Sequence, residues 1–214
     1  MNAQELINAM DDSIRLADSG SSKLSGAVLA MEGMSGAKNR HFLNNLMSHA
    51  GVRYLEIGTW KGSTLVSSLY KNSPEFSLAI DNFSQFGSPR DDFHANCTAF
   101  LGTTPNFLDA DCFTLDPKTV SGLSNINVYF YDGEHSPQSQ CGALAHYLPV
   151  LADEFIFIVD DWNWSSVRGG TQDGIAGSNL EIVHKWEHIG PDDGTRDVDG
   201  WWNGLFVAVM KKKV

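Results

Sequence analysis

Short runs of β-branched and aromatic residues alternate with helical segments through the middle of the chain, and this alternation limits the fold more than any other feature. The runs cover residues 52–57, 76–80, 106–108, 126–131 and 155–159. Helices are expected between them, at residues 61–70, 90–101 and 136–151. Strands that alternate with helices form βαβ units, in which helices cover both faces of a parallel sheet. The pattern therefore predicts an α/β fold with a mostly parallel, Rossmann-like sheet.

The two ends of the chain add further elements to this core. Helical periodicity at residues 1–19 and at about 37–49 predicts an N-terminal helical cap over residues 1–50. We expect residues 51–214 to form the single globular unit that follows. The apolar run at 204–210 is a candidate edge strand, antiparallel or parallel, in a sheet of about seven strands. A helix is expected around Trp186.

The charge balance argues against two classes of partner. The chain has 26 acidic and 15 basic residues, a formal net charge of −11. Such a surface repels nucleic-acid phosphates and anionic lipids, so we expect no nucleic-acid or membrane partner. Cys97, Cys112 and Cys141 fit neither a disulfide framework nor a zinc knuckle, which favours a reducing compartment. Without a signal-peptide pattern or a long apolar stretch, the expected location is the cytoplasm.

Carboxylates stand at or just beyond the ends of four of the five predicted strands. They are Asp81, Asp111, Asp132 and the adjacent pair Asp160 and Asp161. Ligands of open α/β sheets bind outside the carboxyl ends of the strands, so we expect these side chains around one crevice. Aspartate is also a common loop and helix-capping residue, which accounts for any one of them taken alone.

The loop after the first predicted strand has the pattern Glu56-x-Gly58-x-x-x-Gly62. Its glycines allow a tight turn and a close approach of the backbone to a ligand, and the start of a helix follows. The G-x-G-x-x-G pattern of dinucleotide-binding enzymes is not met, because Glu56 stands where the first glycine would be. A carboxylate there disfavours a pyrophosphate and favours a cofactor that carries positive charge.

These motifs together resemble those of a known family. Residues 56–62 resemble the first motif of class I S-adenosylmethionine-dependent methyltransferases. The runs Y-D-G-E-H-S at 131–136 and V-D-D-W at 159–162 resemble a narrower, metal-dependent branch of small-molecule O-methyltransferases that modify sugars and antibiotics. The resemblance spans about residues 52–171 and implies that residues 51–214 are a methyltransferase domain.

The resemblance implies a binding site for S-adenosyl-L-methionine. The implied cofactor-binding residues are Glu56, Gly58, Thr59, Gly62, Ser63, Asp81, Asp111, Cys112 and Asp132. Among these, Glu56 and the two glycines would line the methionine part, and Asp81 would accept hydrogen bonds from the ribose hydroxyls. Asp111 and Cys112 would lie by the adenine amino group.

The same branch places a divalent metal, usually Mg²⁺, on Asp132, Asp160 and Asp161. Carboxylates at the ends of neighbouring strands crowd together, and like charges that close share a proton, bind a cation or turn apart. Hard oxygen ligands suit Mg²⁺ or Ca²⁺ better than zinc. The alternative is that Asp161 faces solvent, because successive residues of a strand point in opposite directions.

The candidate catalytic residues follow one another on the loop after the fourth predicted strand. They are Asp132, which would act through the metal, and Glu134 and His135, either of which is a candidate general base. His135 has the better unperturbed pKa for that role, whereas the resemblance places an acidic base at Glu134. A structural His135 that caps the next helix is a further alternative.

The predicted function is methyl transfer to a hydroxyl group of a small molecule such as a sugar or secondary metabolite. Residues 162–171, with their two tryptophans, are expected to form a loop that supplies a substrate wall. The alternatives are a metal-independent methyltransferase of another acceptor atom, a non-catalytic cofactor-binding module and an NAD-linked oxidoreductase. The methyl acceptor and a possible homo-oligomeric state are not determined by the sequence.

Overall fold

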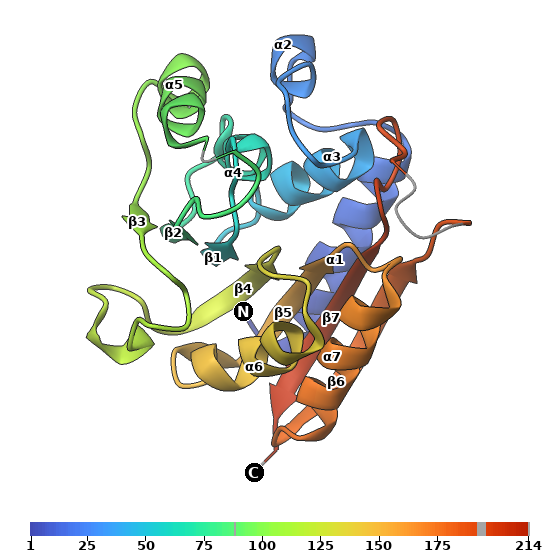
Figure 1. Cartoon of the computed structure of the whole chain (residues 1–214). Coiled ribbons are helices and arrows are strands. Elements are labelled where there is room, and N and C mark those ends of the chain that lie inside the picture. The colour runs from blue at the N-terminus through green and yellow to red at the C-terminus, as the bar shows by residue number, and fades with distance from the viewer. Residues whose placement is uncertain (88, 192–195, 214) are drawn as a thin grey trace.

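The computed structural model describes residues 1–87, 89–191 and 196–213, which form a layered α/β structure around one sheet (Figure 1). In this described part the sheet has seven strands in the order β3-β2-β1-β4-β5-β7-β6. Five strands are parallel: β1 (Arg53–Ile57), β2 (Phe76–Asp81), β3 (Phe107–Asp109), β4 (Ile126–Tyr131) and β5 (Leu151–Asp160). The predicted Rossmann-like, mostly parallel α/β fold is confirmed.

The C-terminal run is an antiparallel strand inserted between two others. β7 (Leu205–Lys212) pairs in antiparallel fashion with β5 on one side and with β6 (Leu180–His188) on the other. The predicted run at 204–210 is therefore an inner strand and not an edge strand. β6, which forms the edge, includes Trp186, so the helix predicted there is wrong. His184 and Trp186 face the N-terminal helix and alternate with the exposed Lys185, which is the period of a strand.

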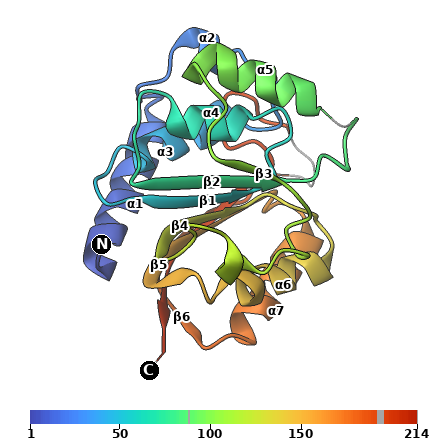
Figure 2. The same ribbon diagram turned by 90° about the vertical axis from the view of Figure 1, so that its left-hand side faces the viewer.

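Helices cover both faces of the sheet (Figure 2). One layer contains α1 (Ala3–Asp18), α2 (Gly26–Leu29), α3 (Ala37–Leu46), α4 (Ser63–Leu69) and α5 (Arg90–Leu101). The other contains α6 (Pro137–Tyr147) and α7 (Ser165–Ala176), and a short 3₁₀ turn, η1 (Pro117–Thr119), precedes β4. Within β4, Val128 and Phe130 belong to the core under the first layer, and Tyr129 and Tyr131 to the core under the second. This alternation explains why every residue of β4 is buried.

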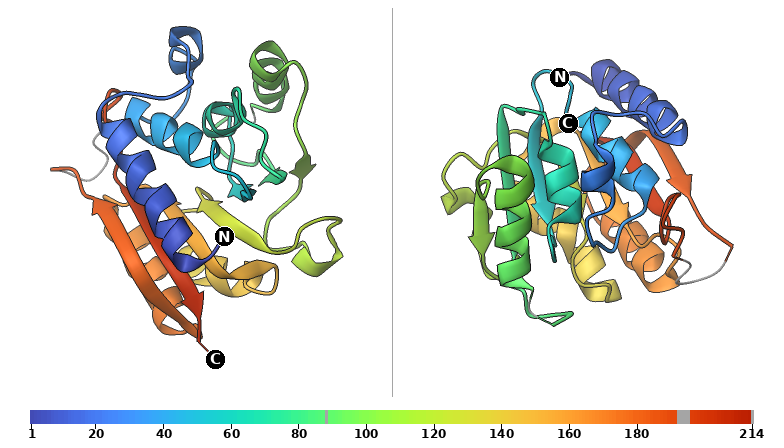
Figure 3. Two further views of the ribbon diagram at one scale, coloured as in Figure 1. Left: turned by 180° about the vertical axis from the view of Figure 1, so that it is seen from behind. Right: turned by 90° about the horizontal axis from the view of Figure 1, so that it is seen from above.

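The N-terminal helices are part of the first of these cores. α1 begins with a capping box between Asn2 and Glu5 and buries Leu6, Met10 and Ile14. It lies against β5 and β7 and beside α3 (Figure 3). Residues 1–50 thus share a hydrophobic core with the sheet. Among the described ranges of the chain, no helix is both long and apolar enough to cross a membrane.

Two glycines allow α7 to pack closely against α6. A Cβ atom at Gly170 would stand 2.5 Å from the carbonyl oxygen of Pro137, and one at Gly174 would stand 2.6 Å from that of Cys141. The two helices begin directly after the loops at 132–136 and 161–164. Their close packing therefore sets the distance between those loops.

We expect Gly174→Ala to lower the free energy of unfolding by about 1–3 kcal/mol, because the new methyl group forces the two helix backbones apart. The matched control is Gly169→Ala in the same helix, where a Cβ atom meets nothing within 4 Å. This control should raise the free energy of unfolding by about 0.5–1 kcal/mol through helix propensity. Urea denaturation followed by circular dichroism measures both. Equal effects of the two substitutions would contradict the packing argument.

Candidate functional site

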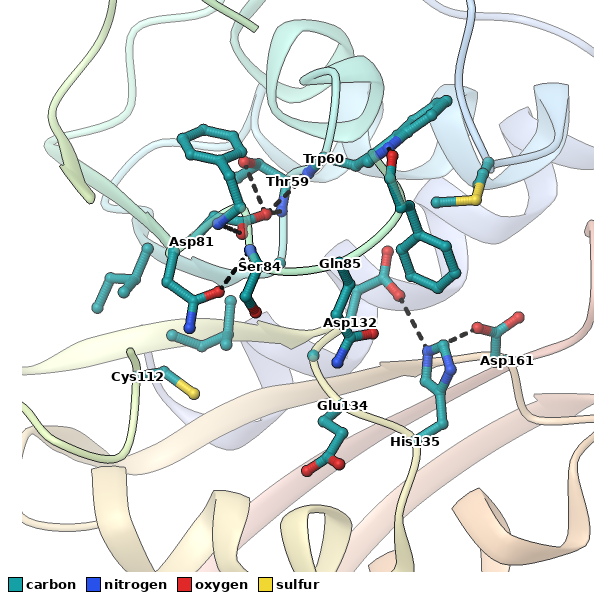
Figure 4. Close-up of a pocket in the computed structure, with 18 of the residues that line it drawn as sticks. Thr59, Trp60, Asp81, Ser84, Gln85, Cys112, Asp132, Glu134, His135 and Asp161 are labelled. Carbon is teal, nitrogen blue, oxygen red and sulfur yellow. Dashed lines mark hydrogen bonds and ion pairs between the residues drawn. The ribbon is translucent and has the colours of Figure 1, made fainter. Parts of the chain in front are cut away.

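A cavity of about 450 Å³ opens at the carboxyl ends of the parallel strands (Figure 4). The loops after successive strands each contribute to its wall. Their contributions include Gly58 and Thr59 after β1, Asp81 at the end of β2, Asp111 and Cys112 after β3, Asp132 and His135 after β4, and Asp161 after β5. The residues that we expected around one crevice are thus largely brought together.

Gly58 is the point of closest approach between two of these loops. Its φ is +85°, in the left-handed region that favours glycine, and a Cβ atom there would overlap the carbonyl oxygen of Asp132. The loop then passes to Gly62, which precedes α4 with a φ of +84°. Gly62 and Ser63 are not among the described residues that line the cavity, so their contribution is to the course of the loop.

Asp81 ties the ends of β1 and β2 together. Its Oδ2 accepts hydrogen bonds from the backbone N–H groups of Thr59, at 2.7 Å, and Trp60, at 2.9 Å. Its Oδ1 accepts one from the N–H of Phe83, at 2.7 Å. Oδ2 also accepts a 3.3 Å hydrogen bond from the hydroxyl group of Thr59. Each carboxylate oxygen offers about two lone-pair positions, so the capacity to accept a hydrogen bond from a hydroxyl group of a ligand remains on Oδ1. Asp81 therefore shapes the loop and also faces the cavity.

Glu56 lies beneath the loop and not in the cavity wall. It is fully buried and accepts hydrogen bonds from the hydroxyl groups of Tyr54 and Thr64, both at 2.6 Å. Burial raises the pKa of Glu56 to about 8, although these two hydrogen bonds oppose the shift. The side chain is then neutral at pH 7. The charge argument that links Glu56 directly to a cationic cofactor does not hold in this geometry.

The burial of Glu56 predicts a pH dependence of stability. Its pKa is about 4.3 in an unfolded chain and about 8 in the fold, so the folded protein binds this proton more tightly. The stabilisation is present in full below about pH 4 and is lost as the pH rises to about 8. We therefore expect the titration of Glu56 to lower the free energy of unfolding by up to about 4 kcal/mol as the pH rises from about 4 to about 8.

Glu56→Gln should flatten this dependence, because glutamine replaces the neutral acid and does not titrate. The measurement is urea denaturation of the wild type and the variant at several pH values between 5 and 8. Glu75→Gln, at an exposed glutamate, is the control and should keep the wild-type slope. Parallel curves for the wild type and Glu56→Gln would show that Glu56 is already ionised in the fold.

Asp132, His135 and Asp161 form a compact cluster in the cavity (Figure 4). The Nε2 atom of His135 lies 2.9 Å from Oδ2 of Asp161 and 4.0 Å from Oδ1 of Asp132. Burial lowers the pKa of His135, but the two carboxylates outweigh it and raise this pKa to about 10. Burial also raises the pKa of Asp132, to about 7. Asn203 donates a 2.7 Å hydrogen bond to Asp161. Trp164 packs edge-to-face against the imidazole of His135, with the two ring centroids 4.5 Å apart.

Asp160 is separated from this cluster, contrary to the expected metal set. It is buried, does not line the cavity and accepts a 3.2 Å hydrogen bond from Nδ2 of Asn39. Burial raises its pKa well above the usual range. Asp160 follows the alternation of Ile156 and Ile158, which belong to the core under α1 and α3. A turn with a φ of +54° sends Asp161 into the cavity, so the concern that Asp161 faces solvent does not apply.

The two candidate bases occupy different environments. Glu134 is exposed and accepts hydrogen bonds from the hydroxyl groups of Ser136 and Ser139 at the start of α6. Its side chain points away from Asp132 and Asp161, whereas His135 lies between them (Figure 4). The geometry therefore favours His135 as the group in contact with both carboxylates.

Parts of the cavity wall had no signal in the sequence. They come from the segment before α3, the loop after β2 and the turn before β7: Met34, residues 82–86, Trp202 and Asn203. Of the expected substrate wall at 162–171, Trp164 is the part that faces the cavity. Trp162 and Asn163 are buried before α7 begins, residues 165–171 lie in α7, and Thr171 is buried against Gln140. Loops that are far apart in sequence and lack a motif converge only through the tertiary fold.

No protein-family model matches the chain, and no curated protein sequence matches it either. Solved structures share its fold at low sequence identity. The O-methyltransferase from Bacillus cereus in complex with SAH has a TM-score of 0.59 and 16% identity, over 95% of this chain and 91% of that chain. The O-methyltransferase TomG from Streptomyces achromogenes, involved in tomaymycin synthesis and solved with SAM, has a TM-score of 0.59 and 15% identity, over 97% and 99%.

TrmN from Thermus thermophilus has a TM-score of 0.58 and 14% identity, over 87% of this chain and 52% of that chain. The chain thus spans about half the length of TrmN. Identities in this range show a shared fold. The resemblance to class I methyltransferases that the sequence motifs indicated is therefore confirmed at the level of the fold.

Proposed function

We propose that the chain is an S-adenosylmethionine-dependent methyltransferase that acts on a hydroxyl group of a small molecule. The observation that carries this proposal is the cavity at the carboxyl ends of β1, β2 and β4, with Gly58 and Asp81 in its wall. This is the position at which open α/β sheets bind their ligands. The fold is shared with O-methyltransferases whose structures contain SAM or SAH, which supports the same cofactor here.

The residues around the cavity divide the work of binding the cofactor. Gly58 lacks the side chain that would overlap the carbonyl oxygen of Asp132, so the loops after β1 and β4 can meet at the wall of the cavity. Asp81 accepts hydrogen bonds from the ribose hydroxyls of the cofactor. Asp111 and Cys112 border the space for its adenine ring. Glu56 acts from below by fastening β1 to α4 through Thr64. Its role is to support the loop.

Asp132, His135 and Asp161 are suited to hold a divalent cation. Their ligand atoms lie within 4.8 Å of one another, and two carboxylates with an imidazole suit Mn²⁺ or other first-row metals as well as Mg²⁺. A bound cation would lower the pKa of an acceptor hydroxyl and fix its position. Asp160 does not fit this set, because its carboxyl group is buried against Asn39.

The 2.9 Å contact between His135 and Asp161 supports a second version of the mechanism, which needs no metal. Asp161, held by Asn203, orients the imidazole, as a carboxylate orients the histidine of a catalytic dyad. His135 would then accept the proton of the attacking hydroxyl through its neutral form. Because its pKa is about 10, this form is a minor one at pH 7, and turnover by this version should rise as the pH approaches 10. The two versions differ in whether a cation or a proton occupies the space between the carboxylates.

The proposal for a small acceptor rests on the charge of the cavity wall. Among the described residues, five carboxylates line the cavity, and they disfavour the phosphates of nucleic acids: those of Asp81, Asp111, Asp132, Glu134 and Asp161. Incubation of a small-metabolite extract with methyl-labelled cofactor should place the label in the small-molecule fraction. Label confined to added RNA or protein would contradict the proposed acceptor class.

We expect the wild-type protein to bind S-adenosylhomocysteine in calorimetric titration. Asp81→Asn should weaken this binding at least tenfold, because it removes a charged acceptor and disturbs the loop at Thr59 and Trp60. The control is Asp153→Asn, at a carboxylate whose side chain is 95% exposed, and it should leave the affinity unchanged. A wild-type protein that binds no S-adenosylhomocysteine would refute the proposed function.

We also expect Mn²⁺ to bind, with an affinity that falls at least tenfold in Asp132→Asn. Calorimetry with and without S-adenosylhomocysteine measures this, and Asp153→Asn again serves as the control. A wild-type protein that binds neither Mn²⁺ nor Mg²⁺ under either condition would reject the metal-assisted version. It would leave the version in which His135 is the base, and His135→Gln should then abolish turnover.

A further inference from the structure

Two adjacent aspartates at the end of β5 have different surroundings: Asp160 contacts Asn39 of α3, and Asp161 faces the cavity. We propose that Asp160 is a positioning residue that fastens the end of β5 to α3 through Asn39, so that Asp161 faces His135. Asp160 is accordingly not a ligand of a divalent cation in the cavity. The proposal concerns the geometry of the Asp161–His135 pair and does not depend on the cofactor or the methyl acceptor.

The first support is the environment of Asp160. Its side chain is 3% exposed, and it continues the face of β5 that packs under α1 and α3. Asn39 of α3, itself 1% exposed, donates its Nδ2 hydrogen to Asp160, and the backbone N–H of Asp161 also interacts with this carboxyl group. For Asp160 to bind a cation in the cavity, it would have to leave these partners.

The second support is the hydrogen-bonding capacity of Asn39. Within the described residues its Oδ1 is a buried acceptor with no hydrogen-bond partner. An ionised carboxylate beside it cannot donate a hydrogen bond, whereas a neutral acid or an amide can. The pocket around Asp160 therefore matches an acid–amide pair.

The third support is the backbone at Asp161. Its φ of +54° is left-handed, a conformation that costs a non-glycine residue about 1 kcal/mol or more and persists only when its surroundings hold it. On the cavity side, Asp161 is held by Asn203 at 2.7 Å and by His135 at 2.9 Å. On the opposite side, the residue before it is held by Asn39. The turn is thus held from both sides.

The N-terminal part of the chain therefore takes part in the site. α3 lies outside the predicted methyltransferase domain, yet its Asn39 reaches the strand end that positions a cavity carboxylate. Asn39 does not line the cavity. Its loss should therefore change the positions of Asp161 and His135 indirectly, through Asp160.

The test follows the ring signals of His135 by NMR in the metal-free protein at a single pH of 7, with His135→Gln to assign them. Asp161→Asn should move these signals, because the ring loses its charged partner. Asp160→Asn should leave them in place, because the new amide keeps the bond from Asn39 and donates one to its Oδ1. Asp160→Ala and Asn39→Ala should shift the His135 signals in the same direction as Asp161→Asn does, because both remove the contact that holds the end of β5.

Two results would overturn the proposal. One is an Asp160→Asn shift as large as that of Asp161→Asn, which would mean that the charge of Asp160 acts on His135 directly. The other is unmoved signals in both Asn39→Ala and Asp160→Ala. Circular dichroism checks that each variant is folded, and Asp160→Asn keeps the test decisive if an alanine variant does not fold.

Mn²⁺ titration of the same proteins gives a second comparison. Asp161→Asn should lose at least tenfold in affinity, whereas Asp160→Asn should stay within twofold of the wild type. Equal losses in the two variants would assign Asp160 to the metal and overturn the proposal. If the wild type binds no Mn²⁺, the NMR comparison decides alone, so this outcome is distinct from a failure of the proposed function.

Discussion

The close approach of two strand ends at Gly58 is the constraint on which the rest of the site depends. A side chain there would overlap the carbonyl oxygen of Asp132, so the loops after β1 and β4 can only meet if one of them carries glycine. This contact brings the first loop, held by Asp81, beside the second loop, which carries His135. A change at Gly58 would therefore disturb both halves of the cavity at once.

The layered fold was predictable because its signal is local and repeated. Each parallel strand is a short apolar run bounded by a helix, and burial on both faces removes any ambiguity about which side is polar. β6 was missed because it is an edge strand whose outer residues, such as Lys185 and Glu187, are charged and exposed. The order β5-β7-β6 depends on pairing between distant segments, which no local pattern encodes.

The site was predictable in its location and less so in its details. Carboxylates at strand ends must gather at one edge of the sheet, and Asp81, Asp132 and Asp161 do so. The direction of an individual side chain is harder to predict. A shift of one residue in the end of a strand reverses the side of the sheet that the side chain faces. Asp160 and Glu56 both point into the layer of α3 and α4, where Asn39 and Thr64 are their partners. The sequence motifs identified both residues, but the directions of their side chains became known only from the tertiary structure.

The burial of these two carboxyl groups also changes the electrostatics of the site. A count of acidic residues assigns the same charge to every carboxylate, but burial raises the pKa of Glu56 to about 8 and that of Asp160 well above its usual range. Glu56 is therefore neutral near pH 7, and both groups meet their neighbours through hydrogen bonds. The carboxylates that a cationic ligand would meet are instead those in the cavity wall, among them Asp81 and Asp161. The sulfonium of the proposed cofactor would thus be attracted by groups other than the acidic residue of the first motif, whose burial makes it a support for the loop.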